Sequence, residues 1–191
     1  ILKSYLTIID QTALPLNVTT IDCRNLESVV HAIRVLQVRG APAIGIAAAY
    51  GICVGLQTID ADQCTTQQFD ERLQHCVKQL ADSRPTAVNL FWALQRMQSV
   101  TQTLRQAGQL PSPIMKALLK EAIAIHDEDR EMCHAIGKHG ATLLDHGQGV
   151  LTHCNAGGLA TSEYGTALSV LFSAQDQGKT LHVFVDETRP L

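Results

Sequence analysis

Apolar residues recur at helical spacing along most of the first 144 residues, and short β-branched runs stand near both ends of the chain. An apolar side chain every three or four residues marks the buried face of an amphipathic helix. On this pattern we expect helices over residues 26–37, 42–56, 67–81, 86–107 and 113–144. Runs at 5–10 and 17–23, separated by Pro15, predict a short antiparallel pair of strands before the first helix.

The residues at the helix starts support these ranges. We expect Asn25 and Thr66 to cap the first and third helices, because their side-chain oxygens can accept the free N–H groups of a first turn. Pro42 suits the first turn of the second helix, where a missing N–H is tolerated. That helix is rich in alanine and apolar all round, so we expect it to be buried on nearly every side.

The pattern changes after residue 144. Residues 149–153 and 180–186 read as strands, residues 162–176 as a helix between them, and Gly178 as the turn that follows the helix. A strand, a helix and a second strand in this order form a βαβ unit, which builds a parallel sheet.

Two domains follow from this arrangement, with a boundary in the proline-containing segment 109–113. We expect an α/β protein with a small, mainly helical N-terminal domain and a short β start over residues 1–112. A long linking helix and the first βαβ unit of a second domain would occupy residues 113–191. The chain lacks an initial methionine and stops just after a strand-like run, so we expect a fragment truncated at the C-terminus.

Composition narrows the class of protein. The 191 residues are 46% hydrophobic and 17% charged with a net charge of -3, which is typical of a globular protein and gives no support for nucleic-acid binding. The most apolar segment, 41–56, is short for a bilayer span, so we expect no membrane contact. Six cysteines without a CxxC pair indicate reduced thiols and a cytoplasmic protein.

Eight histidines raise the question of a metal site, particularly His126, His134 and His139 with Cys133 among them. On one helix, positions 134 and 139 differ by about 140° of rotation, which is poor geometry for two ligands of one ion. We therefore expect a solvated helix face here, and neither a metal nor a cofactor.

The segment GVLTHCNAGGLAT, residues 149–161, places a cysteine where a strand ends and a glycine-rich turn begins. We expect Thr161 to cap the helix that follows, so that free N–H groups face the loop around Cys154, a setting typical of reactive thiols and anion sites. The alternative is an inert packing cysteine, since cysteine is among the most often buried residues.

Two arginines also precede predicted helix starts. Arg39, Gly40 and Ala41 come directly before Pro42, and Arg84 comes directly before a Pro-Thr pair. Backbone amides and a guanidinium at such a start can bind a phosphate, although an arginine there can also cap a neighbouring helix. Two such arginines suggest one phosphate-bearing ligand.

Acidic residues follow the last predicted strand. Asp186 and Glu187 could act as acid, base or acceptor of a sugar hydroxyl. We expect a supporting role instead, ordering the loop that contains Arg189, because nothing in the local pattern favours a protonated carboxyl group at neutral pH.

Three segments together resemble the methylthioribose-1-phosphate isomerase family: RGAPAIG (39–45), RPTAVNL (84–90) and GVLTHCNAGGLAT (149–161). Leu14-Pro15 and ETRP (187–190) extend the resemblance over essentially the whole chain. It implies that Arg39, Gly40, Ala41 and Arg84 bind the substrate and that Cys154 is the active-site cysteine.

The resemblance also implies a fold and an assembly. The second domain would be the start of a Rossmann-like domain that is shared with the regulatory subunits of translation initiation factor 2B, in a homodimer. The catalytic aspartate of the family would lie beyond Leu191. This portion alone is therefore expected to be inactive.

The implied reaction converts 5-methylthioribose 1-phosphate, a small sugar phosphate, to 5-methylthioribulose 1-phosphate in methionine salvage. Whether hydrogen moves from C2 to C1 as a proton or as a hydride is left open. Two alternatives also stay open: a non-catalytic regulatory subunit of the initiation-factor type, and a ribose-1,5-bisphosphate isomerase. The cysteine in HCNAGG argues against the first, and RPTAVN against the second.

Overall fold

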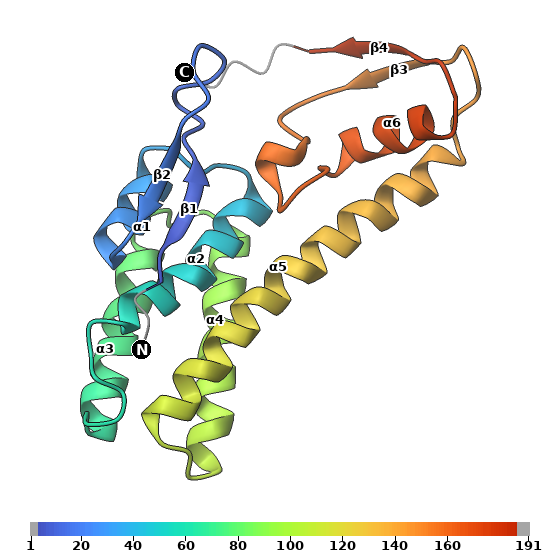
Figure 1. Ribbon diagram of the computed structural model, residues 1–191. Coiled ribbons are helices and arrows are strands. Elements are labelled where there is room, and N and C mark those ends of the chain that lie inside the picture. Colours follow the sequence, from blue (N-terminus) through green and yellow to red (C-terminus); the bar gives the residue numbers. More distant parts are fainter. Residues whose placement is uncertain (1–3, 187–191) are drawn as a thin grey trace. The chain divides into compact units, whose positions relative to one another are not determined.

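The structure is a computed structural model that describes residues 4–186 (Figure 1). The chain divides into two compact units, Ile1–Ile125 and His126–Leu191, which are described separately. The division falls inside helix α5 (Pro111–Ala141). The domain boundary expected between residues 112 and 113 lies in the first turn of that helix and stays a prediction.

The first unit begins with the expected antiparallel pair. Strands β1 (Leu6–Ile9) and β2 (Thr20–Cys23) pair with Leu6 opposite Cys23. Helix α1 (Leu26–Arg34) follows directly, and Asn25 caps it as predicted, accepting a hydrogen bond from the Ser28 N–H at 2.8 Å. The helix ends earlier than the expected residue 37, because Leu36 adopts a left-handed φ of 65°.

Helices α2 (Ala41–Leu56), α3 (Thr66–Ala81) and α4 (Val88–Gln106) complete the order expected for this part. The cap of α3 is Thr65 and not Thr66, so that prediction was wrong by one residue. Thr65 Oγ1 accepts the Gln68 N–H at 3.2 Å, and the Gln68 side chain accepts the Thr65 N–H at 2.9 Å. This reciprocal capping box requires a hydrogen-bonding side chain three residues after the cap, which Thr65 has in Gln68, whereas Thr66 is followed at that spacing by Phe69.

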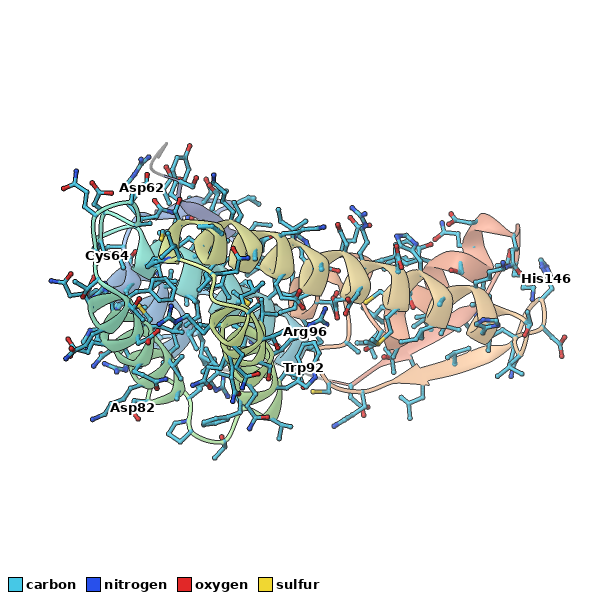
Figure 2. All side chains as sticks on the ribbon, turned by 90° about the horizontal axis from the view of Figure 1, so that it is seen from below. Asp62, Cys64, Asp82, Trp92, Arg96 and His146 are labelled. Carbon is cyan, nitrogen blue, oxygen red and sulfur yellow. The ribbon has the colours of Figure 1, made fainter. Side chains whose placement is uncertain are left out.

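Helix α2 forms the centre of the first unit and is buried on nearly every side, as predicted. Its glycines let neighbours approach closely: a Cβ at Gly55 would lie 2.6 Å from the Cys76 sulfur of α3. Helix α4 carries an ion pair from Arg96 to Glu121 of α5, and the Arg96 guanidinium lies 5.5 Å from the centre of the Trp92 ring (Figure 2). The core is therefore built from small residues on α2 and larger apolar residues around it.

The second unit contains the expected βαβ unit. Strands β3 (Gly149–Thr152) and β4 (His182–Val185) are parallel, with Gly149 paired to His182, and helix α6 (Ala167–Asp176) connects them (Figure 1). The end of α5 packs against α6, where a Cβ at Gly137 would lie 2.7 Å from the Ser169 carbonyl oxygen. The expected α/β fold, mainly helical with a small parallel sheet, is confirmed.

Lysine fixes the end of α5. Lys179 Nζ donates to the carbonyl oxygens of Ala141 and Leu144, both at 2.7 Å, and so satisfies groups that a helix end leaves free. Within residues 4–186, no helix combines the length and the hydropathy needed to cross a bilayer.

Candidate functional site

Two helix starts in the first unit lack side-chain caps and follow an arginine. Gly40 is the N-cap of α2, has a φ of 97° and offers no capping side chain, and Ala87 at the start of α4 offers none either. Uncapped first turns leave N–H groups that can bind an anion. Arg39 directly precedes the cap of α2, whereas Arg84 lies three residues before the cap of α4 and its carbonyl accepts the Ala87 N–H at 3.1 Å; both arginines are partly buried.

The two arginine-bearing segments meet inside the first unit. A Cβ added at Gly45 of α2 would lie 2.9 Å from the Asn89 carbonyl oxygen of α4, so the second turn of α2 directly contacts the first turn of α4. Arg39 Nε also donates to Gln11 Oε1 at 3.3 Å, and the Gln11 N–H donates to the Gln37 carbonyl at 3.0 Å. Sequence reasoning missed Gln11, which no motif distinguishes, whereas Asn89 lies inside the RPTAVNL segment.

Cys154 lies at the carboxyl end of β3 and is the exposed cysteine among the six, all of which fall within residues 4–186. Cys154 is therefore not a buried packing cysteine, and the reactivity of its thiol stays a prediction. Burial describes the other thiols better: desolvation raises the pKa of Cys53 to about 12 and that of Cys76 to about 11. Both thiols stay protonated, and hence unreactive, at neutral pH.

The turn after Cys154 differs from the expectation. No α-helix begins at residue 162; a short 3₁₀ turn, η1 (Gly158–Ala160), is followed by an irregular segment, and α6 begins only at Ala167. Thr161 is buried, and its hydroxyl donates to the Glu163 carbonyl at 3.0 Å instead of capping a helix. The predicted helix start beside the thiol is therefore absent.

Two residues of this segment instead have strained backbone angles. Cys154 has a φ of 67° and Tyr164 a φ of 66°, both in the left-handed region that side chains other than glycine seldom adopt. Strain of this kind persists only where the surroundings hold it, and it concentrates at functional sites. Gly165, with a φ of 83°, closes the segment against Ala156, whose carbonyl accepts the Thr166 N–H at 2.9 Å.

Helix α5 contacts the irregular segment between η1 and α6. Asp129 accepts the Ser162 N–H at 2.7 Å, and His134 pairs with Glu163 at 3.0 Å while its ring stacks on Tyr164 at 4.4 Å. His134 is exposed, as expected for a solvated helix face, but this face also contacts the loop through Asp129 and His134. In the part of the chain that the structure describes, no three His, Cys, Asp or Glu side chains gather as metal ligands would.

A further pair joins the ends of the parallel strands. His153 Nδ1 lies 2.8 Å from Asp186 Oδ2, and the Asp186 N–H donates to the Thr152 carbonyl at 3.2 Å. Asp186 thus contacts the residue before the cysteine, a partner that the sequence did not suggest. Glu187 and Arg189, which the loop-ordering hypothesis invoked, lie outside the described residues.

Arg39, Gly40, Ala41 and Arg84 belong to the first unit, and Cys154 belongs to the second. The structure brings the two arginine segments together through α2 and α4. The convergence of both arginines and Cys154 on one substrate stays a prediction.

Comparison with known families shows that residues 37–191 match the Initiation factor 2 subunit family. Among curated proteins, the chain is 50% identical to methylthioribose-1-phosphate isomerase of Geobacter sulfurreducens, over 95% of this chain and 51% of the relative. It is also 50% identical to 5-deoxyribose 1-phosphate isomerase of Moorella thermoacetica, over 96% and 51%. The resemblance inferred from the three motifs is confirmed, and the chain spans about half the length of these relatives.

Solved structures agree with the fold. The structure of 5-methylthioribose 1-phosphate isomerase from Pyrococcus horikoshii matches with a TM-score of 0.89 and 37% identity, covering 97% of this chain and 51% of that one. The initiation factor eIF-2B subunit delta from A. fulgidus matches with a TM-score of 0.83 and 40% identity, covering 100% and 56%.

Proposed function

The chain belongs to the Initiation factor 2 subunit family, and we propose that the complete protein isomerises 5-methylthioribose 1-phosphate to 5-methylthioribulose 1-phosphate. The observation that carries this proposal is the exposed Cys154 on a strained turn at the carboxyl end of β3. Active sites of open parallel sheets lie at the carboxyl ends of the strands. The strain at this position costs about 1 to 2 kcal/mol, and strain of this kind is concentrated at functional sites.

The first unit supplies the phosphate-binding half of the proposed site. Arg39 and Arg84 each precede an uncapped first turn, so a guanidinium and backbone amides can bind the same phosphate. The names of the relatives fit such a ligand, because both describe a pentose with phosphate on C1. Both also describe a C5 without a free hydroxyl or a phosphate.

The proposed reaction has two steps, ring opening and hydrogen transfer, which need different groups. Phosphate on O1 locks the sugar ring, so an acid must protonate the ring oxygen while the bond from that oxygen to C1 breaks. Hydrogen must then move from C2 to C1, and we assign Cys154 to this step. The acid would come from the part of the protein that this chain does not include.

We further propose a cytoplasmic homodimer with a Rossmann-like second domain, acting without a cofactor. The free cysteines fit a reducing compartment. The βαβ unit of β3, α6 and β4 is the element from which a Rossmann-like sheet grows.

A regulatory subunit of the initiation-factor type is the second candidate, and the 0.83 TM-score to the subunit delta structure favours it. Such a subunit has no use for a strained, exposed thiol. We therefore rank it below the isomerase, and ribose-1,5-bisphosphate isomerisation below both.

Lysine substitutions test the phosphate half of the site. In the complete protein we expect Arg39→Lys and Arg84→Lys to raise KM for 5-methylthioribose 1-phosphate about tenfold to a hundredfold, because lysine keeps the charge but loses the planar fork. Initial rates measured against substrate concentration give KM and kcat for the wild type and both variants.

Arg34→Lys is the matched control, since Arg34 is an exposed residue in the last turn of α1. Its KM should stay within about twofold of the wild type, as for other surface changes away from a site. Equal KM values in all four proteins would remove both arginines from the phosphate site, and a wild type without turnover would overturn the isomerase.

A further inference from the structure

The pair formed by His153 and Asp186 has no assigned role in the proposed site. The two residues follow neighbouring parallel strands directly, after Thr152 of β3 and Val185 of β4, which are register partners. Their side chains meet at 2.8 Å, from Nδ1 to Oδ2, and the His153 side chain is 78% exposed. An imidazole bound through one nitrogen and open to solvent therefore stands next to Cys154 in the sequence, at the carboxyl end of the sheet.

The proposed reaction needs a group of this kind. When a C1-phosphorylated aldose becomes a ketose, C2 turns from an alcohol carbon into a carbonyl carbon. Its hydroxyl proton must leave whether the C2 hydrogen moves as a proton or as a hydride, so a base is needed on either route. Cys154 is assigned to the transfer of the hydrogen bound to C2. The proton of the C2 hydroxyl therefore still needs an acceptor.

We propose that His153 accepts the C2-hydroxyl proton and that Asp186 positions its ring, an inference that rests on the proposed isomerase activity. With the Asp186 carboxylate accepting the N–H of Nδ1, Nε2 keeps a free lone pair on a side chain that is 78% exposed. The O–H bond of C2 breaks, its electron pair forms the carbonyl, and the proton passes to Nε2. The acid gives one proton to the ring oxygen, and His153 takes one proton from the C2 hydroxyl. After turnover, one proton passes through solvent from His153 to the acid, and both groups return to their starting states.

The chemistry of the pair favours this role over a simple link between strands. The main-chain bond from Asp186 to Thr152 already joins the strand ends, so the side-chain pair is not needed for sheet pairing. A carboxylate that holds one imidazole nitrogen fixes the tautomer and stabilises the imidazolium that forms. Imidazole is also the side chain whose protonation changes most readily near neutral pH.

Kinetics of the complete protein test the inference. We expect His153→Gln to lower kcat for 5-methylthioribose 1-phosphate about a hundredfold to a thousandfold with KM within about threefold, the usual range for removing a proton-transfer group. Asp186→Asn should lower kcat about tenfold, because the ring loses its orientation. In the pH profile of kcat, His153→Gln should abolish the acidic limb of the wild-type curve.

His182→Gln is the matched control, since His182 is an exposed histidine at the opposite end of β4. It should leave kcat and the pH profile unchanged. Free imidazole should restore part of the activity of His153→Ala, which a purely structural role would not allow.

The outcomes separate the role of the pair from the isomerase activity itself. An active wild type whose His153→Gln variant keeps kcat within threefold and the same pH profile overturns the role of His153 and leaves the isomerase intact. Loss of kcat without imidazole rescue, together with a lowered melting temperature, assigns the pair to structure only and also overturns the role. A wild type without turnover overturns the proposed function and this inference with it.

Discussion

Replacing Cys154 by serine in the complete protein is expected to lower kcat for 5-methylthioribose 1-phosphate at least about a thousandfold. The thiol is exposed at the carboxyl end of β3, on a residue whose φ of 67° sets it apart from ordinary strand ends. Serine keeps nearly the same shape but lacks the acidity and nucleophilicity of a thiol. Stopped assays that follow the ketose product give the turnover number directly.

Folding should be unaffected by this change, because the side chain is exposed and serine adds no bulk. The melting temperature of Cys154→Ser should match that of the wild type. Cys64→Ser, at a half-buried cysteine in the first unit, is the control and should keep wild-type turnover. Turnover within tenfold of the wild type in Cys154→Ser would remove the cysteine from the chemistry.

Replacing Gly165 by alanine is expected to destabilise the second unit strongly. A Cβ there would lie 2.5 Å from the Ala156 carbonyl oxygen and 2.6 Å from Gly157 Cα, both backbone atoms that cannot turn away. The φ of 83° adds strain for any L side chain. We expect a loss of about 3 kcal/mol or more, since left-handed strain and overpacking combine.

Gly178→Ala separates the two causes. Gly178 has a similar φ of 78°, but nothing lies within 4 Å of its added Cβ. Its cost should be about 1 kcal/mol, from strain alone. Denaturant unfolding of the complete protein, with hydrogen exchange of the β3 and α6 amides, measures the loss of stability in both variants. Equal losses in Gly165→Ala and Gly178→Ala would show that the close approach to Ala156 adds nothing to the cost.

Long periodic segments of the fold could be predicted from the sequence. The stripe of apolar residues fixed α3 and α4 to within two residues at each end, and Asn25 identified the start of α1 because its cap is local. Local chemistry also explains the error at Thr65, where two adjacent threonines compete and only the glutamine three residues later decides. Such features depend on neighbours along the chain.

The segment between Cys154 and Ala167 could not be predicted in this way. Thr161 is a plausible N-cap, so the local sequence alone begins the helix at residue 162. Contacts from α5 decide otherwise, because Asp129 and His134 hold Ser162 and Glu163 in a non-helical path. Tertiary contacts override propensity where the two disagree.

The candidate site shows the same division. Glycine and proline mark the start of α2, so the uncapped turn beside Arg39 is readable from the sequence. The meeting of His153 with Asp186 depends on the register of β3 against β4, which no local signal specifies. Residues 33 positions apart become partners only when that register is known.

Competition between two sugar phosphates tests the central claim most directly. The complete protein is given an equimolar mixture of 5-methylthioribose 1-phosphate and ribose 1,5-bisphosphate, and phosphorus NMR follows both as they convert to ketoses. We predict that the methylthio sugar is consumed first, at least about tenfold faster, with Cys154→Ser consuming neither. Preferential consumption of the bisphosphate would contradict the substrate assignment, and conversion of neither by the wild type would contradict the isomerase itself.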